Sequence, residues 1–340
     1  MPASEKPRRF SGSTPARSAR AAATPQVVPL TQWRCDYIEG GDAFRRNQFT
    51  SRKIASMILS LLRTIGRAPL GLLHFAGTVC GWAAYALVTG FRRKTRQNLT
   101  IAGLYRPGLA WASAAAAGQA ALETCYIWFR PAATLLARSR CDAYAELARQ
   151  TEARRLAGDR SGTIILTPHI GSFELGARIY AALAPITVLY KAPRRDDLHR
   201  ILQAARSHPQ LTAVPADTGG VRSLLRALKR GEAIGILPDQ VPSAGEGRWA
   251  AFFGRPAFTM TLPARLAERT GAPVYLLATW RLPFGRGWDL ELERVEEAPE
   301  PEAINRRIEA VIRRRPGQYV WSYNRYKVPP GEPVPGREAA

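Results

Sequence analysis

TIILTPHIGSFE, residues 163–174, joins a short apolar run to a turn and to the start of a helix. The apolar residues Thr163–Thr167 predict a buried strand. Pro168 and Gly171 predict a turn directly after it. In open α/β sheets, functional sites gather outside the carboxyl ends of the strands. His169, which lies in this turn, is therefore a candidate for chemistry.

Strands and helices alternate along the rest of the chain. This order predicts an α/β fold, with a mixed sheet flanked by helices. A long loop rich in glycine and proline is expected after residue 237. The expected strands are 163–167, 186–190, 233–237, 273–280 and 288–295, and the expected helices are 219–231, 260–271 and 301–314.

The chain divides into five segments by composition. Residues 1–56 are expected to form a disordered basic tail, and a start codon placed too early would explain them. Residues 57–96 are expected to form a membrane anchor helix and 97–155 a helical connector. The connector forms one domain with the catalytic part, 156–330, and a short tail, 331–340, ends the chain.

The run from Leu70 to Phe91 contains no charged residue. A bilayer core needs about 20 helical residues, so this run predicts a helix that spans or embeds in a membrane. Arg92, Arg93 and Lys94 follow at once, and the positive-inside tendency then predicts a cytoplasmic catalytic domain. The alternative is a buried or interfacial helix, which the glycine and alanine content favours.

The stretch from Gly108 to Ala137 predicts a second helical region, interrupted by Glu123 and by Arg130–Pro131. A carboxylate is costly in lipid. We therefore expect this region to pack on the core or to face the membrane, and we do not expect a second span.

Composition narrows the class of protein. The chain carries 49 basic and 27 acidic residues, a net charge of +22, which favours acidic partners or is a solvated basic surface. Its four cysteines are widely spaced and contain no CxxC, so neither a zinc site nor a disulfide framework is expected. No metal and no cofactor is predicted.

A histidine near neutral pH can act as a general base, and a carboxylate can orient its ring. His169 and Glu174 are five residues apart, which a regular helix would not place side by side. His169 must then lie in the turn before the helix if the two are to meet. The structural alternative is that His169 supports the helix start and that Glu174 is a solvated acid in its first turn.

The wider sequence resembles the lipid A late acyltransferases, which belong to the lysophospholipid acyltransferase superfamily with its HxxxxD/E motif. The resemblance covers roughly residues 57–330. The segments that carry it, in family order, are TPHIGSFE (167–174), LYKAPRR (189–195), GVRSLLRALKRGEAIGILPDQ (220–240), FFGRPAFTMTLPARLAERTGAPV (252–274) and PGQYVWSYNRYK (316–327).

The resemblance implies a reaction and roles for two residues. His169 would take the proton of an acceptor hydroxyl, and Glu174 would orient His169. The resulting alkoxide would attack the thioester of an acyl carrier protein, and backbone N–H groups at the helix start would stabilise the oxyanion. The acceptor would be a lipid A precursor, and the enzyme would lie at the bacterial inner membrane with its catalytic domain facing the cytoplasm.

The resemblance also implies substrate-binding residues. Lys191 stands where the family usually has arginine and cannot make a planar bidentate contact, so Arg194 or Arg195 would substitute. Asp239 would position basic residues or the acceptor, or would be a loop acid that caps backbone N–H groups. The aromatic residues Trp249, Phe252 and Phe253 would line an acyl groove or face the bilayer, with a core role as the alternative.

Three other classes of protein compete with this interpretation. A nucleic-acid-binding protein would explain the charge but not the uncharged run. A glycerolipid or other glycolipid acyltransferase, using acyl carrier protein or coenzyme A, shares the base and the carboxylate. It usually carries a Pro-Glu-Gly-Thr-type motif, whereas this chain has LPDQVPSAGEG (237–247). A non-catalytic membrane scaffold is disfavoured by the intact His169 and Glu174.

Overall fold

A computed structural model describes residues 56–190 and 208–335. In this part of the chain, seven strands form one sheet in the order β1-β9-β8-β2-β5-β3-β4, and β6 and β7 form a separate hairpin. The strands β8, β2, β5, β3 and β4 are parallel. β9 is antiparallel to β8 and parallel to β1. The predicted α/β fold with a mixed sheet is confirmed.

The strands at the centre of the sheet are mostly apolar, and helices therefore cover both of their faces. The two strands that matter most for the site, β2 and β5, are neighbours with Ile164 opposite Ile234. The strands are β1 (Ser139–Arg140), β2 (Thr163–Leu166), β3 (Ile186–Tyr190), β4 (Leu211–Pro215), β5 (Ala233–Ile236), β6 (Gly247–Phe252), β7 (Arg255–Met260), β8 (Val274–Arg281) and β9 (Trp288–Val295).

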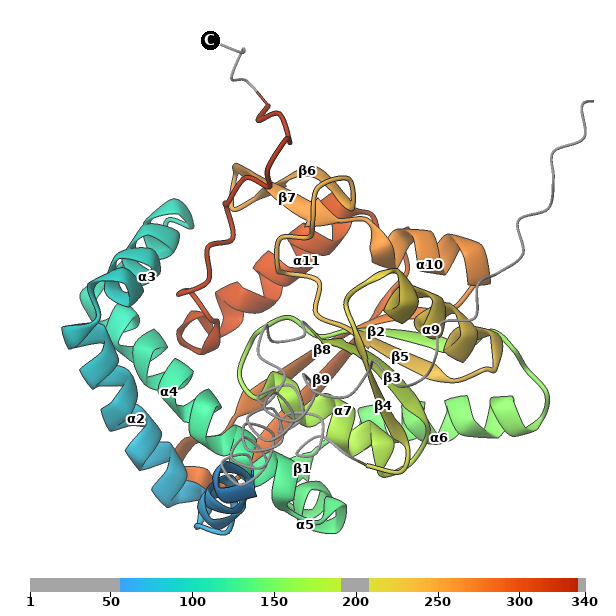
Figure 1. Cartoon of the computed structure of the whole chain (residues 1–340), viewed down its shortest axis with the longest axis horizontal. Coiled ribbons are helices and arrows are strands. Elements are labelled where there is room, and N and C mark those ends of the chain that lie inside the picture. The colour runs from blue at the N-terminus through green and yellow to red at the C-terminus, as the bar shows by residue number, and fades with distance from the viewer. Residues whose placement is uncertain (1–55, 191–207, 336–340) are drawn as a thin grey trace, which may run out of the picture. The chain divides into compact units, whose positions relative to one another are not determined.

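The helices form two layers with the sheet between them (Figure 1). One buried cluster joins the sheet to α9, α10 and α11, and the other joins it to α5, α6 and α7. The α-helices are α2 (Leu70–Leu87), α3 (Thr89–Ile101), α4 (Pro107–Phe129), α5 (Ala132–Ala137), α6 (Asp142–Leu156), α7 (Phe173–Ala181), α9 (Thr218–Lys229), α10 (Leu262–Thr270) and α11 (Pro301–Arg314). A short apolar helix over Ser56–Gly66 precedes them.

Helices α2 and α4 pack against each other in antiparallel directions, and their backbones touch. A Cβ added at Gly81 would lie 2.0 Å from the carbonyl oxygen of Ala114, and one added at Gly118 would lie 2.0 Å from that of Gly77. Only residues without side chains allow this approach. One face of α2 is therefore packed closely against α4.

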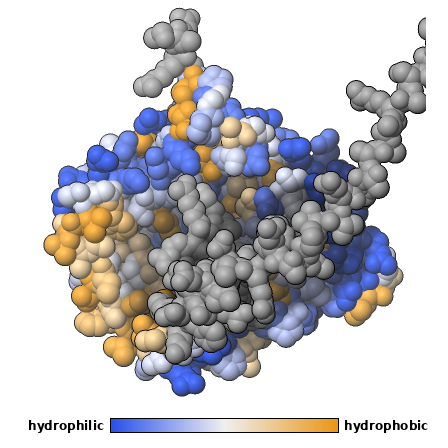
Figure 2. Space-filling view, in the orientation of Figure 1, coloured by the Kyte–Doolittle hydropathy of each residue, from blue (hydrophilic) through white to orange (hydrophobic). Residues whose placement is uncertain are grey.

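The opposite face of α2 is exposed and apolar. Phe75 is 69% exposed, Leu72 56% and Val79 48%. Figure 2 shows hydrophobic residues gathered over the side of the molecule where Figure 1 places α2 and α4. Among the described residues, Leu70–Leu87 is the one helix that is long and apolar enough to cross a membrane.

The uncharged run of the sequence does not form one helix. α2 ends at Leu87, Val88 takes an extended conformation, and α3 begins at Thr89. The predicted interruption at Arg130–Pro131 is correct, since α4 ends at Phe129. Glu123 interrupts nothing, because its carboxylate is hydrogen-bonded inside the core.

The predicted Gly/Pro-rich loop contains the β6–β7 hairpin, which the sequence analysis missed. Trp249 of β6 lies across from Phe258 of β7, and their ring centroids are 5.5 Å apart. Asn305 of α11 holds the hairpin by donating a hydrogen bond to the carbonyl oxygen of Ala251. The hairpin is therefore part of the packed domain.

Candidate active site

The turn between β2 and α7 carries His169 and is held by backbone hydrogen bonds from two other segments. The N–H of Gly171 donates to the carbonyl of Gln318 (2.8 Å), and that of Ser172 donates to Thr279 (2.8 Å). Gly171 has φ +54°, and a Cβ there would lie 1.9 Å from the carbonyl oxygen of Thr279. Glycine is required at this position, as the predicted turn implied.

The His169 ring is held by Asp239. Its Nδ1 lies 2.8 Å from Asp239 Oδ1, and its backbone N–H donates to Oδ2 (3.0 Å). Asp239 is only 2% exposed. The contact arises because β2 and β5 are adjacent parallel strands, so the residues that follow them meet at one edge of the sheet.

Asp239 is ionised at neutral pH. Burial by itself would raise the pKa of this carboxyl, but attraction to the protonated form of the His169 ring and hydrogen bonds from the ring and the backbone N–H of His169 lower the pKa below its usual value. A carboxylate at Nδ1 fixes the tautomer that carries the proton on Nδ1. In the neutral ring, Nε2 then holds the lone pair that a general base needs.

The other ring nitrogen also has a partner. Gln240 follows Asp239 directly, and its side-chain Nε2 lies 3.0 Å from His169 Nε2. The Phe173 ring lies beside the imidazole, with centroids 4.8 Å apart. Two consecutive residues after β5 therefore contact the two nitrogens of one imidazole.

Glu174 lies in the first turn of α7, where its carboxylate accepts a hydrogen bond from the indole N–H of Trp128 (3.1 Å). The carboxylate that contacts Nδ1 of His169 in this structure belongs to Asp239. The orienting role of Glu174 stays a prediction. The sequence suggested Asp239 for the acceptor or for basic residues, and it did not reveal the contact with His169.

A buried charged cluster lies beneath the turn and was missed from the sequence. Glu123 of α4 receives hydrogen bonds from Arg281 Nε (2.9 Å) and from the Ser172 hydroxyl (2.7 Å), and its Oε2 lies 3.0 Å from His74 Nε2. The indole N–H of Trp288 also donates to the Glu123 carboxylate (3.3 Å). The cluster connects α2, α4, β8 and β9 to the turn that carries His169.

The remaining predicted site residues have different outcomes. Lys191, Arg194 and Arg195 lie outside the described residues. Phe252 and Phe253 are buried, 1% and 8% exposed, and both belong to a core cluster. Their burial agrees with the core role that was the alternative in the sequence analysis, and the hairpin turns both rings toward the interior.

Trp249 is half-buried against Phe258. Whether any of the three predicted aromatics contacts an acyl chain stays a prediction.

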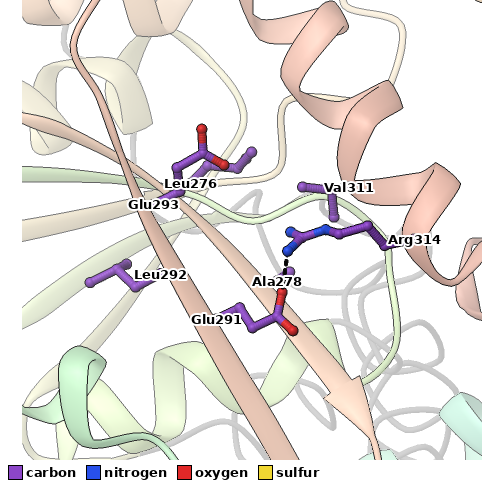
Figure 3. A pocket seen from close by; sticks show the side chains of 7 residues that line it. All are labelled: Leu276, Ala278, Glu291, Leu292, Glu293, Val311 and Arg314. Atoms are coloured by element: carbon purple, nitrogen blue, oxygen red, sulfur yellow. Dashed lines mark ion pairs between the residues drawn. The ribbon is translucent and has the colours of Figure 1, made fainter.

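A hollow of about 230 Å³ lies between α11 and the strands β8 and β9. Figure 3 shows Arg314 pointing toward Glu291 across it, and the two form an ion pair (2.6 Å). Leu276 and Val311 supply apolar lining. His169 is not among its lining residues, so this hollow is separate from the candidate site.

Residues 56–190 and 208–335 contain no group of three or more histidine, cysteine, aspartate or glutamate side chains that could hold a metal ion. The described site offers an imidazole, a carboxylate and a helix start. These groups suit the transfer of a proton from a hydroxyl.

Comparison with known proteins assigns this arrangement to a family. Residues 44–328 match the family model of the bacterial lipid A biosynthesis acyltransferases. The chain is a member of that family. The match covers the sheet, both helix layers and the turn with His169, and it confirms the resemblance found in the sequence.

Three individual relatives support the same family assignment. The chain is 25% identical over 278 residues to the lipid A biosynthesis palmitoleoyltransferase of Escherichia coli (strain K12), which is 77% of this chain and 87% of the relative. The lipid A biosynthesis acyltransferase of Shigella flexneri gives the same values. The lipid A biosynthesis lauroyltransferase of E. coli is 27% identical over 231 residues, 65% of this chain and 72% of that protein.

Membership in the lipid A acyltransferase family establishes the general activity. The protein is an acyltransferase, and the homologous enzymes support acyl transfer in lipid A biosynthesis.

Proposed function

We propose that the protein transfers a fatty acyl chain from an acyl carrier protein thioester to a hydroxyl of a lipid A precursor, with His169 as the general base. The observation that carries the proposal is the hydrogen bond between His169 Nδ1 and the buried carboxylate of Asp239, at a strand-to-helix turn of a lipid A acyltransferase.

The reaction has two steps. The acceptor hydroxyl gives its proton to His169 Nε2 while its oxygen bonds to the thioester carbonyl carbon. The tetrahedral intermediate then collapses, the carbon–sulfur bond breaks, and the thiolate takes the proton from the imidazolium. The Asp239 carboxylate stabilises the imidazolium that forms between the two steps.

The oxyanion of the intermediate needs hydrogen-bond donors. The amides of Gly171 and Ser172 already donate to backbone carbonyls. We assign the oxyanion to the N-terminal end of α7, Phe173–Ala181, where the helix dipole favours negative charge. The amide of Leu175 is excluded, because it donates to the carbonyl of Ser172. This helix end lies directly after the turn that carries the proposed base.

The donor and the acceptor follow from chemistry and from the relatives. Two relatives are named for palmitoleoyl and lauroyl transfer. We propose that this enzyme also transfers fatty acyl chains of this kind. A net charge of +22 suits an acidic carrier protein and an anionic lipid. Lys191, Arg194 and Arg195 are proposed to contact these anionic groups.

The enzyme is proposed to act at the inner membrane, with the catalytic domain on the cytoplasmic side. The apolar outer face of α2 supports membrane attachment. Arg93, Lys94 and Arg96 are exposed on α3, next to that face, where they suit anionic headgroups and agree with the positive-inside tendency. Since its other face packs on α4, we propose that α2 embeds in the membrane while it stays packed against the rest of the domain.

The test is acyl transfer from a labelled carrier-protein thioester to a lipid A precursor in mixed micelles. His169→Ala should lower the rate about 10²- to 10⁴-fold, the usual contribution of general base catalysis. Circular dichroism checks that the variant is folded. A folded His169→Ala enzyme with near-normal turnover would contradict the mechanism, and equal rates with coenzyme A thioesters would contradict the proposed donor.

A further inference from the structure

We propose that Gln240 covers the catalytic nitrogen of His169 until the acceptor arrives, and that it thereby keeps water away from the base. Its side-chain amide lies 3.0 Å from His169 Nε2. This inference rests on the proposed function, because it concerns the nitrogen that takes the acceptor's proton.

The assignment of donor and acceptor follows from Asp239. An ionised carboxylate can only accept hydrogen bonds, so the proton of the neutral ring is on Nδ1. Nε2 is then an acceptor, and the amide N–H of Gln240 donates to it. The acceptor hydroxyl must make the same kind of hydrogen bond to the same lone pair. Gln240 therefore occupies the position that the substrate hydroxyl has to take.

The backbone on either side of Gln240 is fixed. Asp239 is held by the ring and the backbone N–H of His169, and the N–H of Val241 donates to the hydroxyl of Tyr323 (2.9 Å). Exposure differs between neighbours, since Asp239 is buried and Gln240 is half-buried. Displacement by the hydroxyl is therefore a rotation of the Gln240 side chain, with no movement of the loop.

Covering Nε2 has a chemical consequence. With the nitrogen open, a water molecule could give its proton to Nε2 while its oxygen bonds to the thioester carbon. The carbon–sulfur bond would then break, and the thiolate would take the proton, leaving a free fatty acid and a free thiol. A side chain that yields to a bound hydroxyl but excludes water would suppress this loss of the donor.

The first experiment needs no acyl transfer. Diethyl pyrocarbonate modifies unprotonated, accessible imidazole nitrogens, and peptide mass spectrometry gives the rate at His169 relative to His208 of the same molecule. In Gln240→Ala, this ratio should rise about 2- to 10-fold, the equivalent of one neutral hydrogen bond. Gln240→Met, which keeps the volume but not the donor, should give an intermediate ratio. An unchanged ratio in Gln240→Ala would overturn the proposal.

The second experiment measures hydrolysis of the labelled carrier-protein thioester without acceptor, and transfer with acceptor. The ratio of hydrolysis to transfer should rise about 2- to 10-fold in Gln240→Ala, and adding His169→Ala should abolish the extra hydrolysis. A ratio equal to that of the wild type, or extra hydrolysis that survives His169→Ala, would overturn the inference. If wild-type transfer does not depend on His169, the proposed function fails instead, and the modification experiment still tests the contact.

Discussion

Glu123 of α4 and Arg281 of β8 form a buried ion pair directly beneath the turn between β2 and α7, with side chains 1% and 4% exposed. Arg281 also donates to the carbonyl of Gly171 (3.2 Å), while Glu123 accepts from the Ser172 hydroxyl (2.7 Å). The pair thus holds both residues that follow Ile170 in the turn. Charges of this kind are stable in a core only as a matched set.

Replacing Glu123 by alanine should therefore be severe. Arg281 would be left buried without its carboxylate, and breaking such a pair costs about 3–5 kcal/mol. Chemical denaturation in detergent, followed by tryptophan fluorescence, measures the free energy of unfolding. Glu146→Ala is the control, because its pair with Arg149 is exposed and should contribute less than about 1 kcal/mol. Equal losses in the two variants would contradict the expectation.

The same carboxylate should make stability depend on acid pH. Burial would raise the pKa of Glu123, but Arg281 and the hydrogen bond from His74 lower it from 4.5 to about 2. The stabilisation is fully present above about pH 4.5 and is lost as the pH falls toward 2. Unfolding measured across this range should be less steep in pH for Glu123→Gln than for the wild type. Identical slopes would show that Glu123 does not titrate in this way.

Substitutions can distinguish the roles of the two carboxylates proposed for His169, those of Asp239 and Glu174. Asp239→Asn should lower kcat about 10²- to 10⁴-fold, because an amide no longer fixes the correct tautomer. The family resemblance leads us to expect a severe loss in Glu174→Ala as well. The double variant His169→Ala, Asp239→Asn should be little worse than His169→Ala alone, since groups that act as a unit are not additive. A multiplied loss in the double variant would place Asp239 in another role.

The contact between α2 and α4 should not tolerate side chains. Gly118→Val would push the helices apart, since even a Cβ would lie 2.0 Å from the carbonyl oxygen of Gly77. Overpacking of this kind costs about 1–3 kcal/mol. The control is Gly90→Ala on α3, where nothing lies within 4 Å of the added Cβ. Thermal unfolding of the two variants should differ clearly, and equal midpoints would contradict the close packing.

Charges on the outer face of α2 should weaken membrane binding. Phe75 and Val79 are exposed, so Phe75→Glu with Val79→Glu should leave the fold intact. Each buried apolar side chain contributes about 1.5–3 kcal/mol, so flotation with anionic vesicles should fall at least about tenfold. Leu156→Glu on α6, at a residue 72% exposed, is the matched control. Equal flotation of both variants would mean that α2 does not face the lipid.

The central part of the fold was predictable because its strands are buried on both faces. The predictions for 163–167 and 233–237 match the fully buried strands β2 and β5 apart from the last residue of each. Trp288–Val295 was predicted from its alternating pattern, and it matches β9 to the residue. The edge strand Leu211–Pro215 was missed, since its residues are mostly half-buried and show no apolar run. The β6–β7 hairpin was missed because glycine and proline around it are typical of loops.

The site was predictable only where its residues are close in sequence. His169 could be found from a strand, a turn and a motif. Its partner Asp239 is 70 positions away, and their contact requires β2 and β5 to be neighbours, which no local pattern reveals. The same holds for Glu123 and Arg281, which are 158 positions apart. Local sequence patterns indicated His169 and Asp239 separately, but no pattern predicted that these two residues contact each other.

The backbone contact between α2 and α4 decides how this enzyme could be made soluble. Removing α2 would uncover Gly118 and Ala114 on α4 and would take His74 away from Glu123. A truncated enzyme would thus lose part of its own interior together with its attachment to lipid. A water-soluble enzyme should instead keep α2 in place and replace its outward residues, such as Leu72 and Phe75, by polar ones.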